Sequence, residues 1–186
     1  MYKYRVLMTS VGGSLGAKNI KAMKTSYTDE VWVLGVDINH NHNAQSLADK
    51  FITVPSGGSS DYIYKICNAI KKYNINRVLP CSDEEAIAMS QNKEIIENLG
   101  AKLLTAKDST IKIMSNKIST YKLLKENNID VPYYKELSDY AQLDHYVEDF
   151  YKNYGSFVIK EPVARGNRGT VFLDKNTGEI LRDPEV

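Results

Sequence analysis

A short apolar segment that runs straight into a glycine turn constrains the fold most strongly. Arg5–Thr9 has the composition of a buried strand, and the turn that follows it, residues 10–16, contains three glycines. A helical pattern with Ile20 and Met23 on one face comes next, and Val31–Val36 is a second apolar strand. A strand, a turn, a helix and a strand in this order are typical of a parallel sheet covered by helices. The N-terminal part is therefore predicted to be a Rossmann-like α/β domain.

The same alternation continues to about residue 106. Short apolar strands are predicted at residues 51–54, 78–80 and 102–105, and helical patterns lie between them. This gives about five strands in a doubly wound arrangement. We predict a first domain over residues 1–106.

The pattern changes in residues 107–186. Helical patterns cover 109–115, 117–127 and 141–151, with a weak strand at 131–134 and a hairpin after residue 156. Few strands beside several helices indicate a small α+β unit. Because the chain stops shortly after the hairpin, we expect the layer that would complete this second domain to lie beyond residue 186.

The composition of the chain excludes little and suggests no unusual environment. Its 186 residues carry 24 basic and 23 acidic side chains, which gives a net charge of +1 and no indication of a nucleic-acid or membrane partner. Cys67 and Cys81 have no metal or redox spacing, so buried thiols are expected. No secretory signal or membrane-spanning run is visible, and a cytoplasmic location is expected. Pairing between two copies of the chain is left open.

The hairpin carries a motif suited to phosphate. Phe157–Ile159 forms an apolar strand closed by Lys160, and the following loop contains Gly166 and Gly169 between and beside two arginines. Glycines let backbone amides approach an anion closely, and basic side chains add charge. The loop is predicted to bind a phosphate chain, and an exposed basic loop without a ligand is the alternative.

The glycine turn leaves a second function open. A dinucleotide fingerprint needs glycines at relative positions 1, 3 and 6; Gly13 and Gly16 match the last two, whereas Val11 stands at the first. Asp37 follows about 20 residues later, where a ribose-binding acid would stand. An NAD(P)-binding Rossmann oxidoreductase is therefore one alternative. A non-catalytic Rossmann-like interaction module, in which the turn only packs tightly, is another.

Acidic residues follow the fourth predicted strand. The segment 82–85 reads Ser-Asp-Glu-Glu at the carboxyl end of a predicted parallel strand, which is the edge where open α/β sheets bind ligands. Capping of the next helix is the alternative explanation. His40 and His42 lack a third metal ligand nearby, so no metal site is predicted within this chain.

Taken together, these motifs resemble the ATP-grasp superfamily, in particular the carbamoyl-phosphate-synthase large-chain-like proteins. The resemblance covers essentially the whole chain and rests on the glycine turn 12–16, the segment Pro80–Glu85, the pair Asn116–Lys117 and the hairpin with its lysine and glycine loop. It implies an α/β fold: a Rossmann-like pre-ATP-grasp domain with a parallel sheet over 1–106, then the α+β N-terminal part of an ATP-grasp domain over 107–186.

The resemblance also assigns roles to individual residues. It implies that the nucleotide is bound by Lys117, Lys160, Gly166, Asn167, Arg168 and Gly169. It places the substrate at the carboxyl edge of the first sheet, against Gly12, Gly13, Ser14, Ser82, Asp83 and Glu84. One departure is Glu161, which stands directly after the strand lysine where related proteins have proline. Strand alternation puts Glu161 on the side opposite Lys160.

The activity implied by the resemblance is ADP-forming carboxylate–amine ligation through an acyl-phosphate. The cofactors would be ATP and Mg²⁺, with the magnesium ligands beyond residue 186, and the partners would be small-molecule carboxylate and amine substrates. We expect the 186 residues on their own to bind ATP weakly and to be inactive.

Overall fold

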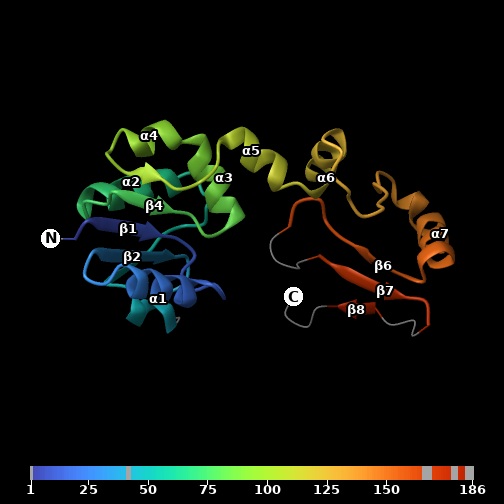
Figure 1. Cartoon of the computed structure of the whole chain (residues 1–186), viewed down its shortest axis with the longest axis horizontal. Coiled ribbons are helices and arrows are strands. Elements are labelled where there is room, and N and C mark those ends of the chain that lie inside the picture. Colours follow the sequence, from blue (N-terminus) through green and yellow to red (C-terminus); the bar gives the residue numbers. More distant parts are fainter. Residues whose placement is uncertain (1, 41–42, 165–168, 177–179, 183–186) are drawn as a thin grey trace. The chain divides into compact units, whose positions relative to one another are not determined.

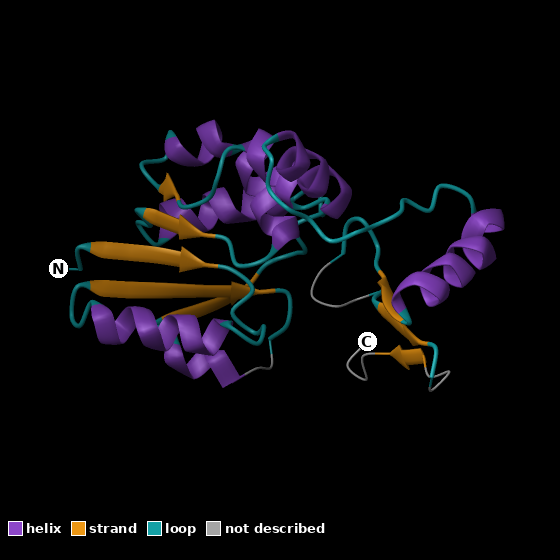
Figure 2. Cartoon of the chain, turned by 45° about the vertical axis from the view of Figure 1, so that its right-hand side comes forward, coloured by secondary structure: helices purple, strands orange, loops and turns teal. Residues whose placement is uncertain are grey.

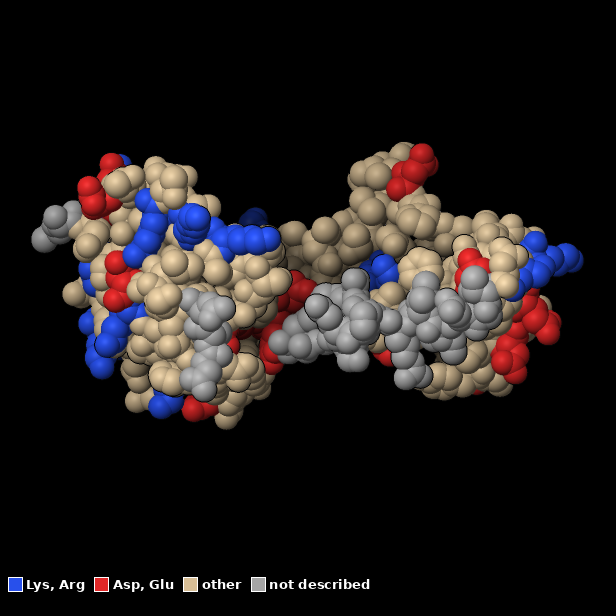
Figure 3. Space-filling model, turned by 90° about the horizontal axis from the view of Figure 1, so that it is seen from below, with Lys and Arg blue, Asp and Glu red and all other residues tan. Residues whose placement is uncertain are grey.

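The chain divides into two units, Met1–Lys112 and Ile113–Val186, which are described separately. The computed structural model describes residues 2–40, 43–164, 169–176 and 180–182 (Figure 1). Over these residues no helix combines the length and the apolar character needed to cross a bilayer. On the face drawn in Figure 3, basic and acidic side chains are interspersed, in keeping with the net charge of +1.

The first unit is built on a five-stranded sheet in the order β3-β2-β1-β4-β5. All four pairings are parallel, and Figure 2 shows the neighbouring long strands running in one direction. The strands are β1 (Tyr4–Met8), β2 (Val31–Asp37), β3 (Lys50–Thr53), β4 (Arg77–Leu79) and β5 (Lys102–Leu103). The predicted doubly wound parallel sheet is thus confirmed, and its order reverses direction between β1 and β4.

Helices cover both faces of this sheet. They are α1 (Gly16–Ser26), the 3₁₀ turn η1 (Asn43–Leu47), α2 (Tyr62–Lys72), α3 (Asp83–Gln91) and α4 (Lys93–Glu97). Helix α5 (Asp108–Met114) follows and contains the boundary between the two units. Val6 and Met8 of β1 pack with Ile20 of α1, whereas Leu7 packs on the other face with Ile66 of α2 and residues of α3 and α4. Because both faces are buried, β1 and β2 are nearly continuous apolar runs instead of alternating ones.

The second unit combines two longer helices with an antiparallel sheet in the order β6-β7-β8. Its elements are α6 (Lys117–Glu126), the 3₁₀ turn η2 (Tyr140–Gln142), α7 (Leu143–Tyr154), β6 (Ser156–Ile159), β7 (Val171–Asp174) and β8 (Ile180–Arg182). The predicted hairpin is present as β6 and β7. Together the two units confirm the predicted fold class.

One predicted strand of the second unit was wrong. Residues 131–134 belong to no sheet among the described residues. Pro132 has no amide hydrogen to give to a ladder. The two tyrosines of this segment pack through their rings instead: Tyr134 lies 5.0 Å from Tyr121, and Tyr133 lies 5.5 Å from Phe150, measured between ring centroids.

Candidate functional site

The loops that meet at the carboxyl edge of the first sheet come from its two central strands. Thr9 and Ser10 follow β1, and Cys81 and Ser82 follow β4. The strand order reverses between β1 and β4, and open α/β sheets bind ligands outside the carboxyl ends of the strands at such a point. The edge predicted from the sequence as the substrate site therefore coincides with the point where the topology of the sheet changes.

A buried carboxylate joins these loops. Glu85 is 5% exposed, and its Oε2 accepts hydrogen bonds from the hydroxyls of Thr9 at 2.5 Å, Ser10 at 2.6 Å and Ser82 at 2.8 Å. Thr9 Oγ1 in turn accepts from the amide of Cys81 at 2.9 Å. Glu85 thus holds the ends of β1 and β4 together.

Glu85 was not among the predicted substrate residues. A signal for it existed in the sequence, because Ser82 and Glu85 have the spacing of a capping box. Its partners Thr9 and Ser10, however, lie more than 70 residues away in sequence. Ser10 also has a positive φ of 50°, which is uncommon outside glycine, at the point where its hydroxyl reaches the carboxylate.

The glycine turn is occupied by contacts within the unit. The amide of Gly12 donates to Asp37 Oδ2 at 2.8 Å, and the other oxygen of Asp37 accepts from Asn39 at 3.0 Å. The amide of Gly13 donates to the carbonyl of Ser10 at 3.1 Å. Asp37 therefore binds the turn itself, at the position where a dinucleotide fold would place a ribose ligand. These contacts favour tight packing of the turn over a dinucleotide site.

Gly16 supports the same conclusion. A Cβ placed on Gly16 would lie 1.9 Å from the carbonyl oxygen of Val11, so only glycine allows α1 to start so close to β1. Ser14 lies exposed between Gly13 and this helix start.

The acidic residues after β4 open α3. Ser82 is the N-cap and accepts from the amide of Glu85, which confirms the capping interpretation. Asp83 is exposed in the first turn, where a negative charge suits the helix dipole. Glu84 Oε1 accepts from the amide of Gly58 at 2.8 Å and so holds the loop after β3. The substrate role predicted for Ser82, Asp83 and Glu84 stays a prediction.

Neither cysteine has the environment of a reactive thiol. Burial, followed by the charge of Glu85, raises the pKa of the Cys81 thiol to about 11. Burial also raises the pKa of Cys67. Both thiols therefore stay protonated near neutral pH, as structural thiols do.

The second unit contains a groove of about 840 Å³ that is lined by Lys117, Lys160 and Gly169. Aromatic side chains of α7 and of residues 133–140 form much of the rest of its wall. Pockets of this size suit a small ligand. Three of the six residues predicted to bind nucleotide thus lie together, whereas Gly166, Asn167 and Arg168 lie outside the described residues. Their role in binding is still a prediction.

Lys117 ties helix α6 to the segment after β6. Its Nζ donates to the carbonyl of Glu161 at 2.9 Å, and its amide donates to the carbonyl of Pro162 at 2.9 Å. The side chain of Asn116 caps the same helix through the amide of Ser119. The Lys117 ammonium therefore lies beside the backbone of the residue that follows Lys160.

Glu161 packs across the base of the hairpin loop. A Cβ on Gly169 would lie 2.8 Å from Cγ of Glu161, and Gly169 also has a φ of +68°. Glycine is needed there for both reasons. The side chain of Glu161 is thereby directed at the stem of the loop.

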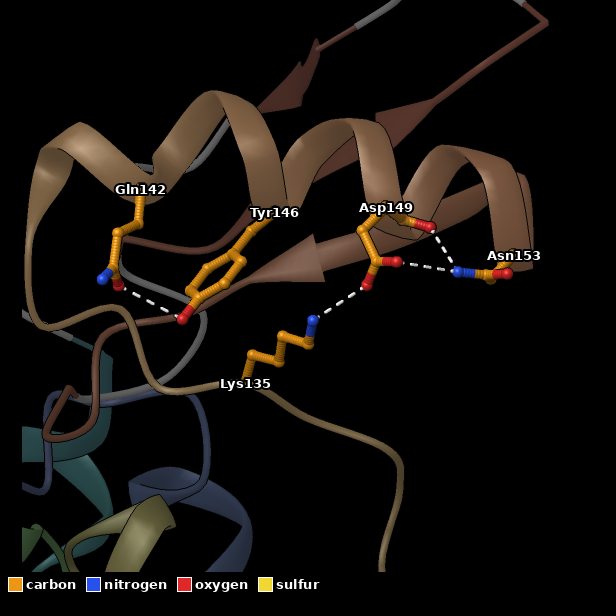
Figure 4. A network of polar contacts seen from close by, with 5 residues as sticks. All are labelled: Lys135, Gln142, Tyr146, Asp149 and Asn153. Atoms are coloured by element: carbon orange, nitrogen blue, oxygen red, sulfur yellow. Dashed lines mark hydrogen bonds and ion pairs between the residues drawn. The ribbon is translucent and has the colours of Figure 1, made fainter.

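A polar network shapes the wall of the groove (Figure 4). Lys135 Nζ lies 3.0 Å from Asp149 Oδ2, and Asn153 donates to the other oxygen of Asp149. One turn earlier on α7, the hydroxyl of Tyr146 donates to Gln142. The hydrogen bond from Lys135 is the main cause that lowers the pKa of Asp149. These contacts hold residues 133–139 against α7.

No group of three or more His, Cys, Asp or Glu side chains in the described part of the chain is arranged to hold a metal ion. His40 packs against the ring of Phe51 at 5.8 Å. The described residues therefore do not form a magnesium site, and the predicted ligands of Mg²⁺ are not assigned to this chain.

A parallel α/β unit followed by a helical unit with an antiparallel hairpin is the arrangement found in the N-terminal parts of ATP-grasp enzymes. Residues 6–104 match the family model described as the PylC-like, N-terminal domain. This match covers more than half of the chain, which therefore belongs to that family. No curated protein matches the chain significantly.

Solved structures agree with this assignment. The ADP complex of purK, N5-carboxyaminoimidazole ribonucleotide synthetase, matches 96% of this chain and 43% of its own, with 17% identity and a TM-score of 0.67. The ADP complex of the Staphylococcus aureus N5-carboxyaminoimidazole synthetase matches 95% and 43%, with 12% identity and a TM-score of 0.67. The biotin carboxylase domain of Hydrogenobacter thermophilus 2-oxoglutarate carboxylase, with MgADP, matches 92% and 37%, with 15% identity and a TM-score of 0.61.

At these identities the structures establish the fold, and the chain spans less than half the length of each enzyme. The prediction is confirmed in part: the chain belongs to the PylC-like N-terminal domain family, and it shares its fold with the N-terminal parts of these ATP-grasp enzymes. The narrower resemblance to the carbamoyl-phosphate-synthase large chain stays a prediction.

Proposed function

We propose that this chain supplies the pre-ATP-grasp domain and the first part of the nucleotide site of an ATP-dependent carboxylate–amine ligase. The groove that brings Lys117, Lys160 and Gly169 together carries this proposal. The relatives solved with ADP add support, since their N-terminal parts share the fold. On this proposal the 186 residues bind a nucleotide weakly and catalyse no turnover alone.

The open face of the second sheet borders this groove, since Val158 and Lys160 line it, whereas Phe172 lies outside it. Val158 and Phe172 are cross-strand partners on β6 and β7 and are 36% and 46% exposed. Strand alternation places Lys160 on the same face as Val158, just beyond the end of β6. A flat apolar surface with a cation at one end suits a base at one side and phosphates at the other. Phe157 and Ile159 point the other way, toward α7.

The chemistry proposed has two steps. A carboxylate oxygen attacks the γ-phosphorus of ATP and ADP leaves, which gives an acyl-phosphate. The nitrogen of an amine then attacks the acyl carbon, phosphate leaves, and the amine loses a proton. Lys160, and Lys117 after exchange of its contact with Glu161, would neutralise phosphate charge during the first step. The substrate would lie at the carboxyl edge of the first sheet.

We also propose that the full enzyme catalyses a reaction similar to that of the carbamoyl-phosphate-synthase large chain. The oxidoreductase alternative is less well supported, because Gly12 and Gly13 donate within the unit and Asp37 is engaged on both oxygens. The interaction-module alternative predicts that no nucleotide binds to the second unit.

Calorimetric titration of the 186-residue chain with ADP tests the proposal. Lys160→Ala should weaken ADP binding by about tenfold or more, because a charge-assisted contact to phosphate is lost. Lys152→Ala is the matched control, since Lys152 is an exposed lysine of α7 outside the groove, and it should leave the affinity unchanged. Equal affinity in wild type and Lys160→Ala would refute the nucleotide role. Saturable NADH binding that is lost in Gly13→Val would favour the oxidoreductase.

A further inference from the structure

Strands β4 and β5 are covered by helices on only one face of the first sheet. Val78 and Leu103 point to that face and lie in the core that also contains residues of α2, α3 and α4. The core on the other face takes its helical residues from α1 and η1 and, among the described residues, includes nothing from β5. Strands of a parallel sheet are normally buried on both faces. The bare face at β4 and β5 therefore leaves room for a further element.

The residues on either side of Val78 and Leu103 point the opposite way, because successive side chains of a strand alternate. These four residues, which we call the β4–β5 face, are Arg77, Leu79, Lys102 and Leu104. Leu104 is 41% exposed, although its amide donates to the carbonyl of Val78 at 2.8 Å and so extends the ladder. Lys102 is exposed as well, and Arg77 and Leu79 are half-buried. The face is thus cationic at its amino end and apolar at its carboxyl end.

The two cations of the β4–β5 face form no ion pair in the described part of the chain. Arg77 and Lys102 are partners in the register of β4 and β5, so two positive charges stand on neighbouring strands. The Arg77 guanidinium donates to the carbonyl of Asn76 at 2.6 Å and lies 5.7 Å from the ring centroid of Tyr4, which leaves further N–H groups for another acceptor. Because like charges on neighbouring strands repel, a carboxylate bound between them would stabilise the face.

The outer edge of β5 is closed to a further strand. The amides of Lys102 and Leu104 donate to carbonyls at β4, whereas the amide of Leu103 points outward and donates to Glu97 Oε1 at 3.3 Å. The same oxygen of Glu97 lies 3.7 Å from Lys93 Nζ, so this carboxylate is engaged. An element that docks here therefore lies on the face, as the helices do on the other side of the sheet.

Charge disfavours a second copy of the chain as the occupant. A two-fold pairing brings the same patch of both subunits together. The cations Arg77 and Lys102 of one copy would then meet those of the other, at a cost in free energy. Charge complementarity favours a partner that carries carboxylates.

We propose that the β4–β5 face binds an amphipathic helix of an acidic partner protein. Apolar side chains of that helix would cover Leu79 and Leu104, and carboxylates beside them would pair with Arg77 and Lys102. The arginine fork suits a carboxylate in two contacts, and the lysine adds a point charge. Arg77 and Lys102 open their strands at the amino edge of the sheet, opposite the edge proposed for the substrate, so this inference does not depend on the proposed function.

The test follows amide shifts in NMR spectra of the 186-residue chain during titration with two synthetic helical peptides of about 15 residues. Both peptides carry leucine along one helical face, and their other positions are mostly glutamate in one and lysine in the other. The glutamate peptide should shift the amides of residues 77–79 and 102–104 saturably, and the lysine peptide should not bind. Absence of saturable shifts with the glutamate peptide, or equal binding of both peptides, would overturn the proposal.

Variants separate the face from net charge. Lys102→Glu should weaken binding of the glutamate peptide by about tenfold or more, because an attraction becomes a repulsion. Lys50→Glu is the matched control, since Lys50 is an exposed lysine of β3 at the other edge of the same sheet, and it should change the affinity little. Leu104→Ser should also weaken binding by about tenfold, and the fold should be kept because this side chain is 41% exposed. Equal losses in Lys102→Glu and Lys50→Glu would refute the docking face.

The oligomeric state of the chain tests the other occupant. Analytical ultracentrifugation should show no association through the β4–β5 face, because the same cations would meet. A dimer that dissociates in Leu104→Ser would assign the face to a second copy and overturn the proposal.

Discussion

The two units of the chain differ most in how completely they bury their apolar residues. Among the described residues, every buried apolar side chain lies between Val6 and Leu103, on both faces of the parallel sheet. In the second unit, no residue whose side chain the structure describes is buried to the same degree. Its sheet is covered by α7 on one face, and the other face leaves Val158 and Phe172 exposed.

This difference separates a unit that is stable by its own packing from one that gains stability from what it binds. A sheet covered on both faces has little apolar area left to bury. A sheet covered on one face gains free energy from any ligand or surface that covers the other. We therefore expect the first unit to be the more rigid of the two, and the second to gain stability when its open face is covered.

Truncation of a buried side chain should show the largest difference in stability between the two units. Leu34→Ala removes a side chain with 0% exposure and should lower the free energy of unfolding of the first unit by about 3 kcal/mol. Phe157→Ala removes a half-buried ring of the second unit and should cost about half as much or less, since fewer contacts are lost. Urea unfolding followed by Trp32 fluorescence reports the first unit, and far-ultraviolet circular dichroism reports both units.

Ile95→Ala provides the control for that measurement, because Ile95 is 52% exposed and its truncation should change stability little. A loss in Phe157→Ala as large as that in Leu34→Ala would show that the second unit has a core of its own and would remove the contrast.

Gly16→Ala should have the next largest effect. The added Cβ would meet backbone atoms of Val11, which cannot move aside as a flexible side chain can. Forced displacement of α1 from β1 should cost about 2 kcal/mol. Thermal unfolding followed by circular dichroism measures this, and a melting temperature equal to that of the wild type would show that the helix start adapts.

The order of elements in the first unit could be predicted because each depends on local patterns. Apolar runs and the glycine turn lie within a few residues of one another, so β1, α1 and β2 followed from the sequence. The strand expected at residues 131–134 failed because it needed a neighbouring strand, which no local pattern supplies, and Pro132 weakened its side of any ladder.

The polar contacts of the site were less accessible to such reasoning. The hydrogen bonds of Glu85 cross more than 70 residues, and the contact from Lys117 to Glu161 crosses 44. Asp37 was correctly placed at the end of β2, yet the partner it takes is the amide of Gly12. Sequence spacing identifies which residues stand at an edge, whereas the partner of each is decided by tertiary geometry.

Two glycines outside the cores allow the units to be compared under equal local conditions. Gly100 and Gly155 both have positive φ, 84° and 75°, and a Cβ on either would meet nothing within 4 Å. Gly100→Ala and Gly155→Ala should therefore each cost about 1 kcal/mol, from backbone strain alone. Chemical denaturation of both variants checks this. A much larger loss at Gly155 would mean that the second unit is marginal throughout, and that its weak core is not the whole difference.

The smallest effect on stability is expected from the loss of one ion pair in each unit. Lys24 and Asp49 lie 2.8 Å apart in the first unit, where Asp49 also accepts from the amide of Val33, whereas Lys135 and Asp149 lie 3.0 Å apart in the second unit, where Asp149 accepts in addition from the side chain of Asn153. Asp49→Asn should therefore lower the melting temperature more than Asp149→Asn, because it also weakens a charge-assisted contact to the backbone.

The pH dependence of the effect of Asp149→Asn on the melting temperature identifies the cause of that effect. The hydrogen bond from Lys135 lowers the folded-state pKa of Asp149 below its ordinary value. A lowered pKa gives stability that is fully present above the unfolded pKa and is lost as the pH falls through the folded pKa. The small difference in melting temperature between wild type and Asp149→Asn should therefore be full at neutral pH, decrease below about pH 4 and disappear in more acidic buffer. It should also decrease with added salt, because both side chains are 30% exposed to solvent. A difference that persists unchanged into acid would show that Asp149 stabilises α7 through its neutral hydrogen bonds, such as that from Asn153, and not through the ion pair.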